Sequence, residues 1–332
     1  MSSFKTISRH IHKRDDILQI LKSSVPLNSL FDIDTHLSKE RVSKFKDLYE
    51  GVGHTPVKEI DLGNKNRLFL KLECENNRGE SHYSRYWIPY LFIAETLGLI
   101  IPGETHLLEV TSGSAGIALS EAAKKLDYKL TLIIPEMLPD ARVNPMVDFG
   151  ANIVKVPGYI DQCIEKLVEM NEGGDYFLTN HSEERANIII DVFRRIAVEY
   201  LSEFSGTDYT VIGLGNGAST EATFRVLESN SSGTKRICFH PSLEDYQTVF
   251  GLYGPNVELR HVGVAKSLSH EVIEIDQKRL NLLKNNRLIQ DYYQVYGDST
   301  LIGMAVCSEI SKRVEGKTFF SIAYDKRERY EE

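Results

Sequence analysis

The chain has 332 residues, of which 42% are hydrophobic and 26% are charged, a composition typical of a soluble globular protein with one large or two modest domains. Its 47 acidic and 39 basic residues give a net charge of −8, which disfavours binding to nucleic acid or to an anionic membrane because like charges repel. Its apolar runs fall short of the roughly 20 residues that span a bilayer. We therefore expect a cytoplasmic protein with neither nucleic acid nor membrane as a partner.

The first 50 residues differ from the rest of the chain. They are rich in charge, and apolar residues such as Ile17 and Leu21 recur at helical spacing. This pattern predicts two or three short helices that need a surface to pack against. We expect this extension to cover the main body of the protein or a dimer interface.

From residue 51 onward, short apolar runs alternate with amphipathic stretches. The expected strands are 67–72, 106–110, 130–134, 153–156, 176–178, 210–214, 236–239, 272–275 and 318–323. The expected helices are 86–97, 116–126, 160–170, 183–204, 219–227, 277–285 and 301–313. Strands that alternate with helices predict parallel sheets covered on both faces, and the length suits two such sheets.

Two strand-to-helix turns have the composition of ligand-binding loops. Residues 111–116, Thr-Ser-Gly-Ser-Ala-Gly, follow an expected strand, and their hydroxyls and amides suit a carboxylate. Residues 213–219, Gly-Leu-Gly-Asn-Gly-Ala-Ser, follow another and suit a phosphate, because alternate glycines before a helix form an anion nest. A tight turn without a ligand is an equally good interpretation of the second pattern taken alone.

The four cysteines, Cys74, Cys163, Cys238 and Cys307, lie far apart and form no Cys-x-x-Cys pair. This spacing disfavours a zinc site or a disulfide framework and is typical of reduced thiols. The sequence also has no His-x-x-x-His pair, so we expect no bound metal.

Taken in order, these pieces resemble the fold-type-II family of pyridoxal-phosphate enzymes, which includes cysteine synthase, cystathionine β-synthase and a 2,3-diaminopropionate pathway synthase. Residues 53–57 resemble the family's Gly-Asn-Thr-Pro-Leu, and residues 111–116 resemble its Thr-Ser-Gly-Asn-Thr-Gly. Residues 213–219 resemble Gly-x-Gly-Thr-Gly-Gly-Thr, residues 297–300 resemble Gly-Gly-Ser-Thr, and residues 325–330 resemble Asp-x-Gly-x-Arg-Tyr. Within this family, the Ser-Thr and Asp…Arg-Tyr motifs are most similar to those of the diaminopropionate synthase branch.

The resemblance implies an α/β fold with two doubly wound parallel-sheet domains, of the tryptophan-synthase-β-like superfamily. It places a helical extension at 1–50, a large cofactor domain at 51–75 plus 185–332, and a small mobile substrate domain at 76–184. It also implies a homodimer, with the extension wrapped onto the partner, and a role in amino-acid or specialised-metabolite biosynthesis.

The family's chemistry needs a lysine that bonds to the cofactor as an aldimine and then moves protons. Counted back from Arg85, that position is Tyr83. Counted forward from Lys71, it becomes His82. The sequence contains no lysine between Lys71 and Lys124. We therefore expect Tyr83 or His82 at the lysine position and pyridoxal phosphate, if bound, to be held noncovalently.

The other site residues follow from the same resemblance. Thr300 is expected to partner the pyridine nitrogen, although another register places Ile302 there, and Asn180 is expected to help hold a substrate carboxylate. The expected cofactor-binding residues are Gly213, Gly215, Asn216, Gly217, Ala218, Ser219, Ser114 and Thr300. The expected substrate-binding residues are Thr111, Ser112, Gly113, Ala115 and Asn180.

Three functions remain open at this point. The chain is a pseudoenzyme that acts by binding, for example to an active paralogue, or it is an enzyme that works on a preformed aldimine or another phosphorylated, amino-acid-like ligand. In the second case Tyr83 or His82 is the acid/base. The third function is ordinary β-replacement on an O-activated serine, which the missing lysine disfavours.

Overall fold

The computed structural model describes residues 7–78, 80–183, 187–230, 233–242, 252 and 259–330. The chain divides into two compact units, one of residues 1–52, 77–192 and 332 (unit 1), the other of residues 53–76 and 193–331 (unit 2). The expected limits were 50, 75 and 184, and the extension was expected to cover the main body of the protein or a dimer interface. Here it groups with unit 1, and helix α7 (Ile188–Glu203) crosses from one unit to the other.

Unit 1 is built on a fully parallel four-stranded sheet in the order β5-β4-β3-β6. Its strands are β3 (His106–Val110), β4 (Lys129–Pro135), β5 (Asn152–Val156) and β6 (Phe177–Leu178). Its helices are α1 (Asp15–Lys22), α2 (Lys39–Tyr49), α3 (Ser84–Thr96), α4 (Ser114–Leu126), α5 (Asp140–Asp148) and α6 (Ile160–Met170). Helix α6 packs on one face through Cys163 against Leu108 and Ile133. Helix α4 packs on the other, where Gly116 lies against Leu132.

Unit 2 has a six-stranded sheet in the order β1-β2-β10-β7-β8-β9, parallel except for the β1–β2 pair. Its strands are β1 (Val57–Gly63), β2 (Asn66–Leu72), β7 (Tyr209–Gly213), β8 (Lys235–Pro241), β9 (Glu271–Ile275) and β10 (Thr318–Ala323). Besides α7, its helices are α8 (Ala218–Asn230), α9 (Arg260–Leu268), α10 (Gln277–Lys284), α11 (Arg287–Tyr292) and α12 (Asp298–Ser311).

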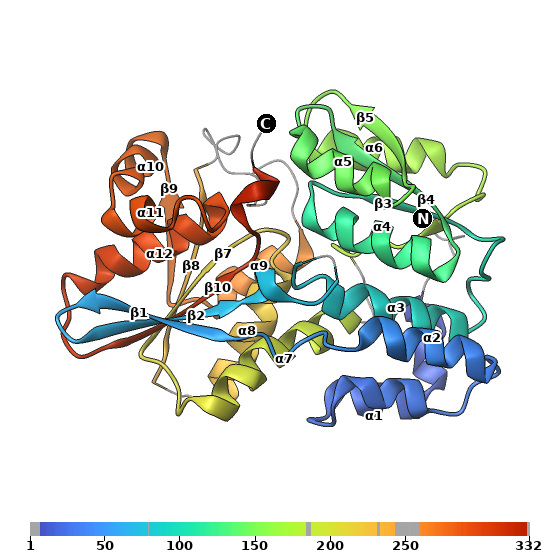
Figure 1. Cartoon of the computed structure of the whole chain (residues 1–332), viewed down its shortest axis with the longest axis horizontal. Helices are drawn as coiled ribbons and strands as arrows, with labels where there is room; N and C mark the ends of the chain where they lie inside the picture. Colours follow the sequence, from blue (N-terminus) through green and yellow to red (C-terminus); the bar gives the residue numbers. More distant parts are fainter. Residues whose placement is uncertain are drawn as a thin grey trace. The chain divides into compact units, whose positions relative to one another are not determined.

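Both faces of the unit 2 sheet are covered, as its apolar strands require. On one face Met304 of α12 packs with Phe319 in a large buried cluster, together with residues of α10 and α11. On the other face Tyr200 of α7 contacts Phe69 and Phe320, with ring centroids 6.1 and 4.3 Å apart. Figure 1 shows α10, α11 and α12 grouped together beside this sheet. The expected doubly wound α/β class is therefore confirmed.

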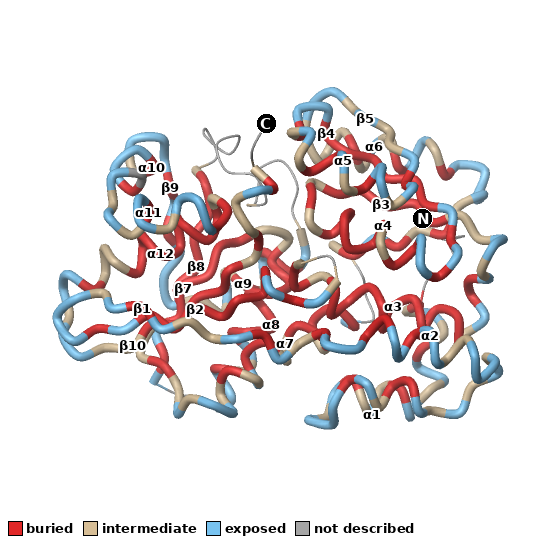
Figure 2. The backbone as a smooth tube through the Cα atoms, in the orientation of Figure 1, coloured by how far each residue is buried: buried red, intermediate tan, exposed pale blue. Residues whose placement is uncertain are grey.

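The helical extension packs within its own chain. Phe31 and Phe45 contact Phe92 of α3 with ring centroids 5.0 and 5.2 Å apart. Arg41 of α2 donates to both carboxylate oxygens of Glu95, at 2.8 and 2.5 Å. Figure 2 shows α3 buried along its whole length, and all 13 of its residues are buried. The extension is thus part of the cover over α3.

Four strands and α-helices of the described residues were not expected from the sequence: β1, α5, α9 and the short α11. Strand β1 carries charged residues and pairs antiparallel at the sheet edge, so it lacks the apolar run of a buried strand. Helix α5 contains Pro145, and α9 contains Gly263, both of which weaken a helical pattern. The expected helix 183–204 begins at Ile188, and residues 184–186 lie outside the described part.

Candidate functional site

In unit 2, residues 213–219 form a tight turn between β7 and α8, which we call the glycine loop. Gly217 has a φ of +86°, a conformation that side chains other than glycine rarely adopt. A Cβ placed on Gly217 would lie 2.4 Å from the backbone nitrogen of Val262 and 2.5 Å from the carbonyl carbon of His261. The loop backbone therefore packs directly on the first turn of α9, and only glycine fits there.

Hydrogen bonds fix the shape of the glycine loop. The Asn216 side-chain oxygen accepts from the Ala218 N–H at 3.1 Å, and the Thr220 hydroxyl donates to the Gly213 carbonyl at 3.2 Å. Ala218 and Ser219 are buried, and Gly215 is half-buried at the bend. The loop thus opens the 13-residue helix α8, whose first N–H groups carry partial positive charge. This is the arrangement that an anion nest requires.

A buried ion pair that the sequence reasoning missed supports the glycine loop. Glu221 of α8 lies 2.7 Å from Nδ1 of His261 and accepts from Arg225 at 2.8 Å. His261 is 1% exposed. Burial alone would raise the pKa of Glu221, but the hydrogen bonds from His261 and Arg225 outweigh it and lower the pKa below its usual value. The four-residue spacing of Glu221 and Arg225 on a helix is a signal for this ion pair in the sequence. The pairing of Glu221 with His261 depends on the tertiary fold.

Tyr324, another residue that was not singled out, connects the glycine loop to Thr300. Its phenol oxygen lies 3.0 Å from the Ser219 hydroxyl, and its backbone N–H donates to the Thr300 hydroxyl at 3.2 Å. Ile302 instead packs in the hydrophobic core of unit 2. The structure therefore brings Ser219, Tyr324 and Thr300 together and leaves Ile302 away from them.

In unit 1, the 111–116 loop is held by its own first side chain and by α5. The Thr111 hydroxyl accepts from the N–H groups of Gly113 and Gly116 at 3.2 and 3.0 Å. Arg142, which is 2% exposed, donates to the Ser112 carbonyl at 3.0 Å. Ser114 begins α4, and the Ala115 carbonyl accepts from the Trp87 indole at 2.8 Å. The loop is therefore rigidly placed at the carboxyl end of β3.

The residues at the expected lysine position lie in an aromatic cluster of His82, Tyr83, Trp87 and His181. Tyr83 immediately precedes α3, and its ring centroid lies 4.2 Å from that of His82 and 5.4 Å from that of His181. The His181 ring also contacts Trp87 at 5.6 Å. Asn180 is exposed with a φ of +43°, so the buried neighbour in this cluster is His181. The sequence reasoning missed His181, one residue beyond Asn180.

A buried carboxylate holds His181 in place. Glu109 accepts from the Thr179 hydroxyl at 2.6 Å and from the His181 N–H at 3.1 Å, and its Oε2 lies 3.3 Å from His181 Nδ1. Its other oxygen accepts from the Val110 N–H at 2.8 Å. Glu109 is 2% exposed, so these polar contacts offset the cost of burying its carboxylate.

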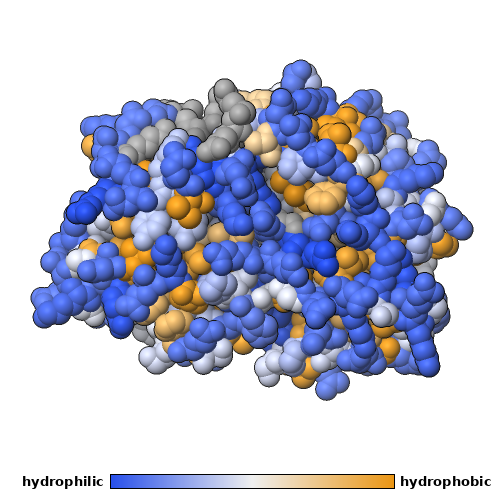
Figure 3. Space-filling model, viewed as in Figure 1, coloured by the Kyte–Doolittle hydropathy of each residue, from blue (hydrophilic) through white to orange (hydrophobic). Residues whose placement is uncertain are grey.

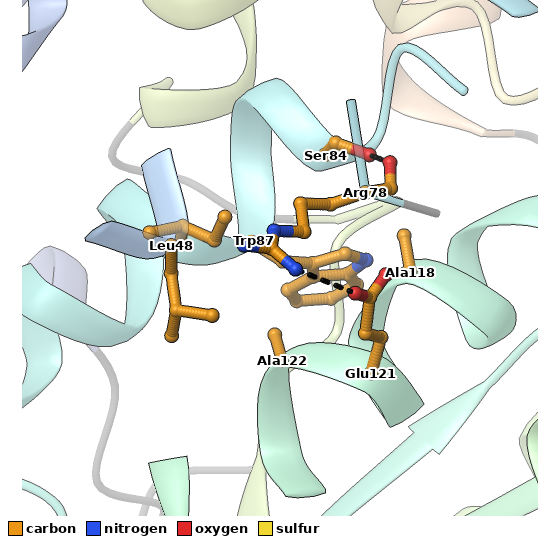
Figure 4. Close-up of a pocket in the computed structure, with 8 residues that line it drawn as sticks. Leu48, Arg78, Ser84, Trp87, Ala118, Glu121 and Ala122 are labelled. Atoms are coloured by element: carbon orange, nitrogen blue, oxygen red, sulfur yellow. Dashed lines mark hydrogen bonds and ion pairs between the residues drawn. The ribbon is translucent and has the colours of Figure 1, made fainter. Parts of the chain in front are cut away.

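The loop that carries Tyr83 is tied to α4 beside a small pocket. Arg78 has a φ of +67°, its carbonyl accepts from the Ser84 hydroxyl, and its guanidinium lies 3.8 Å from Glu121. Figure 4 shows Arg78 and Glu121 facing one another beside Trp87 in this pocket, whose volume of about 10 Å³ suits one water molecule. The pocket is too small for an amino acid, so it serves as part of the support for the loop.

Lys71, which precedes the expected lysine position, is already engaged. Its ammonium donates to the Thr55 carbonyl at 2.5 Å and lies 2.9 Å from Glu199, and the side chain is 1% exposed. This places it in a buried ion pair within unit 2.

The described residues contain no cluster of three or more potential metal ligands. All four cysteines are free and buried, and burial raises the pKa of Cys74 and Cys163 to about 12, which keeps these thiols protonated. Among the helices described, none has the length and apolar character needed to cross a bilayer. In Figure 3, hydrophilic side chains dominate the visible face and apolar ones form small separate groups.

The chain is similar to a known protein family, to several curated proteins and to solved structures. The family model for "Pyridoxal-phosphate dependent enzyme" matches residues 48–306. Cysteine synthase from Flavobacterium sp. is 31% identical over 206 residues, which cover 60% of this chain and 66% of that protein. Cysteine synthase from Staphylococcus aureus is 27% identical over 295 residues, which cover 84% of this chain and 93% of that protein. An O-ureido-L-serine synthase structure has a TM-score of 0.75 at 21% identity, covering 85% of this chain and 92% of its own, which shows a shared fold.

Proposed function

Because the chain belongs to the family of pyridoxal-phosphate dependent enzymes, we propose that it is a cysteine-synthase-like protein that holds pyridoxal phosphate, or an amino-acid adduct of it, noncovalently through the phosphate. The observation that carries this proposal is the glycine loop, where the backbone at Gly217 adopts a conformation and a close approach that only glycine allows. Such a loop at the start of a long helix is suited to a phosphate group.

The residues of unit 2 fit the phosphate end of the cofactor. The N–H groups of Ser219 and Thr220 and the Ser219 hydroxyl would hold the phosphate, beside the Ala218 N–H that Asn216 binds. The Thr300 hydroxyl would serve the ring nitrogen. When bound, the cofactor supplies an electron sink that stabilises negative charge on an amino-acid substrate. The chain itself supplies the anion site and, through the hydroxyls of Ser219 and Thr300, orients what binds there.

The proposal gives the aldehyde end of the cofactor no lysine with which to bond. Residues 72–123 contain none, and the family resemblance aligns Tyr83 with the lysine position. Lys71 is held by Glu199 and the Thr55 carbonyl, which disfavours its use as a replacement amine. These contacts support a ligand that is bound through its phosphate and released without a covalent bond to the chain.

A second candidate, catalysis on a preformed adduct, is favoured by the Glu109–His181 pair next to Tyr83. The Glu109 carboxylate lies 3.3 Å from His181 Nδ1 and accepts a hydrogen bond from the backbone N–H of His181 at 3.1 Å, which holds the imidazole beside Tyr83. The His181 imidazole would then accept a proton from the ligand. Exchange of the α-proton of an amino-acid adduct, followed by NMR in deuterated water, would support this function if Glu109→Gln and His181→Asn each slow it.

The first test is equilibrium dialysis of the purified protein with pyridoxal phosphate, pyridoxal and inorganic phosphate, followed by borohydride reduction and intact mass measurement. We expect pyridoxal phosphate to bind, inorganic phosphate to compete with it, and pyridoxal to bind at least about tenfold more weakly. We expect no mass increase after reduction of the wild type and a stoichiometric increase for Tyr83→Lys. Tyr83→Phe is the matched control, because it keeps the ring and adds no amine.

Two outcomes would overturn the proposal. A stoichiometric, phosphate-sensitive lysine adduct in the wild type would restore the ordinary β-replacement function. Failure of both pyridoxal phosphate and inorganic phosphate to bind would favour a pseudoenzyme that has lost its ligand and acts through protein partners, such as an active paralogue.

We also propose that the protein is a cytoplasmic homodimer that serves amino-acid or specialised-metabolite biosynthesis, as its family resemblance implies. The extension contacts Phe92 through Phe31 and Phe45, and whether it also reaches the partner subunit is part of the test. Light scattering of the full chain gives the oligomeric state, and a variant without residues 1–45 shows whether the extension contributes to it.

A further inference from the structure

Tyr324 lies between Ser219 of the glycine loop and Thr300, the two parts of the proposed ligand site in unit 2. It directly follows β10, which pairs with β7, the strand that leads into the glycine loop. The carboxyl ends of these parallel strands meet at one edge of the sheet, where ligands bind in such folds. Tyr324 is therefore placed at the mouth of the glycine loop by the sheet itself.

Two hydrogen bonds of Tyr324 span this site. The phenol oxygen meets the Ser219 hydroxyl at the phosphate end, at 3.0 Å, and the backbone N–H meets the Thr300 hydroxyl at 3.2 Å. An aromatic side chain thus extends from the residue suited to a ring nitrogen to the residue suited to a phosphate. A ligand that reached from Ser219 to Thr300 would therefore meet this side chain.

The phenol remains neutral in this position. Burial raises the pKa of Tyr324 above its usual value of 10, and the hydrogen bond with Ser219 lowers it only in part, while Glu73 and Asp325 raise it further. The group therefore adds no negative charge to the glycine loop at neutral pH. A phosphate at the glycine loop needs none of the space of the phenol ring, whereas an aromatic ring between Ser219 and Thr300 would compete for that space.

We propose that Tyr324 is a specificity-determining residue that closes the ring end of the site. Resting on the proposed function, this inference states that inorganic phosphate and small phosphomonoesters bind with the Tyr324 side chain in place. A ligand with an aromatic ring, such as pyridoxal phosphate, binds only after the side chain has moved away from Ser219.

The test compares the wild type with Tyr324→Ala, Tyr324→Phe and the control Tyr209→Phe. Tyr209 is the first residue of β7 in the same unit, and its ring stacks on Phe319 with ring centroids 4.8 Å apart. Affinities for pyridoxal phosphate and for inorganic phosphate are measured by calorimetry, and folding is checked by thermal unfolding. Binding, rather than activity, is the readout.

We expect Tyr324→Ala to bind pyridoxal phosphate about tenfold more tightly than the wild type, because no ring has to be displaced. Tyr324→Phe, which loses only the bond to Ser219, should gain about threefold. Phosphate affinity should change less than twofold in every variant, and Tyr209→Phe should match the wild type.

The inference is overturned if folded Tyr324→Ala binds pyridoxal phosphate no better than the wild type. The phenol would then line the cofactor-ring site without blocking it. If Tyr324→Ala does not fold, an unchanged or weaker affinity in Tyr324→Phe overturns it equally. Loss of phosphate binding in the wild type is a separate result, because it contradicts the proposed function whatever Tyr324 does.

Discussion

The glycine loop of unit 2 and the aromatic cluster of unit 1 are built by different means. The glycine loop is made of backbone, with Gly217 pressed against the first turn of α9 and a buried ion pair of Glu221 and His261 behind it. The aromatic cluster is made of side chains, with Tyr83 packed on His82 and His181. A site formed by closely packed backbone tolerates few substitutions at its glycines. A site formed by side chains can change its chemistry by substitution while the fold is kept. The glycine loop is therefore the more constrained of the two.

The largest effect that this comparison predicts is at Gly217. In Gly217→Ala the new Cβ would meet backbone atoms at 2.4 and 2.5 Å with a φ of +86°, so the loop must move. We expect a loss of about 3 kcal/mol in the free energy of unfolding and a loss of phosphate binding. Urea unfolding and calorimetry measure the two quantities.

Gly263→Ala is the matched control for Gly217→Ala. Gly263 lies on α9, at an exposed position where an added Cβ meets nothing within 4 Å. Alanine favours helix over glycine, so this variant should be stabilised by up to about 1 kcal/mol. If Gly217→Ala were as stable as Gly263→Ala, the glycine loop would not be constrained by its backbone.

The next effect concerns the ion pair behind the glycine loop. Glu221→Gln removes the charge that His261 and Arg225 face, and we expect a loss of about 2 kcal/mol at pH 7. Glu228→Gln, on the same helix but 53% exposed at the side chain in its pair with Arg236, should change stability by less than about 0.5 kcal/mol.

The same carboxylate predicts a pH dependence of stability. The pKa of Glu221 in the folded chain lies below 4.5, its usual value. Its stabilising contribution is therefore complete above pH 4.5 and is lost as the pH falls through the folded pKa. The wild type should lose more stability than Glu221→Gln between pH 5 and pH 3, as measured by urea unfolding at each pH. Parallel curves for the two proteins would contradict this assignment.

The aromatic cluster should respond less strongly. Glu109→Gln keeps one side-chain oxygen but loses the charge that binds the Thr179 hydroxyl and the His181 N–H. We expect a loss of about 1.5 kcal/mol, with phosphate affinity unchanged, because the glycine loop belongs to the other unit. A drop in phosphate affinity as large as that of Gly217→Ala would show that the two regions are not independent.

The sequence predicted the parallel sheets and the positions of the strand-to-helix turns at 111–116 and 213–219 because these depend on local pattern. Apolar runs marked β7 and β10, and small residues marked the turn at 213–219. It did not predict Tyr324 or His261, because their roles come from contacts with residues 105 and 40 positions away in the chain. Edge strand β1 was missed for a related reason, since its stability comes from pairing with β2 rather than from its own apolar content.

The smallest predicted effect lies at Asn180, one residue from the aromatic cluster. Its side chain is exposed and its φ is +43°, so Asn180→Gly removes an exposed amide and keeps a permitted backbone conformation. We expect a change of less than about 0.5 kcal/mol in stability and no change in ligand affinity. His181→Ala, at the buried neighbouring position, should cost about 2 kcal/mol through lost contacts with Tyr83 and Trp87. If Asn180→Gly instead weakened binding of an amino-acid adduct while His181→Ala did not, Asn180 would be the ligand contact and the cluster would be only a support.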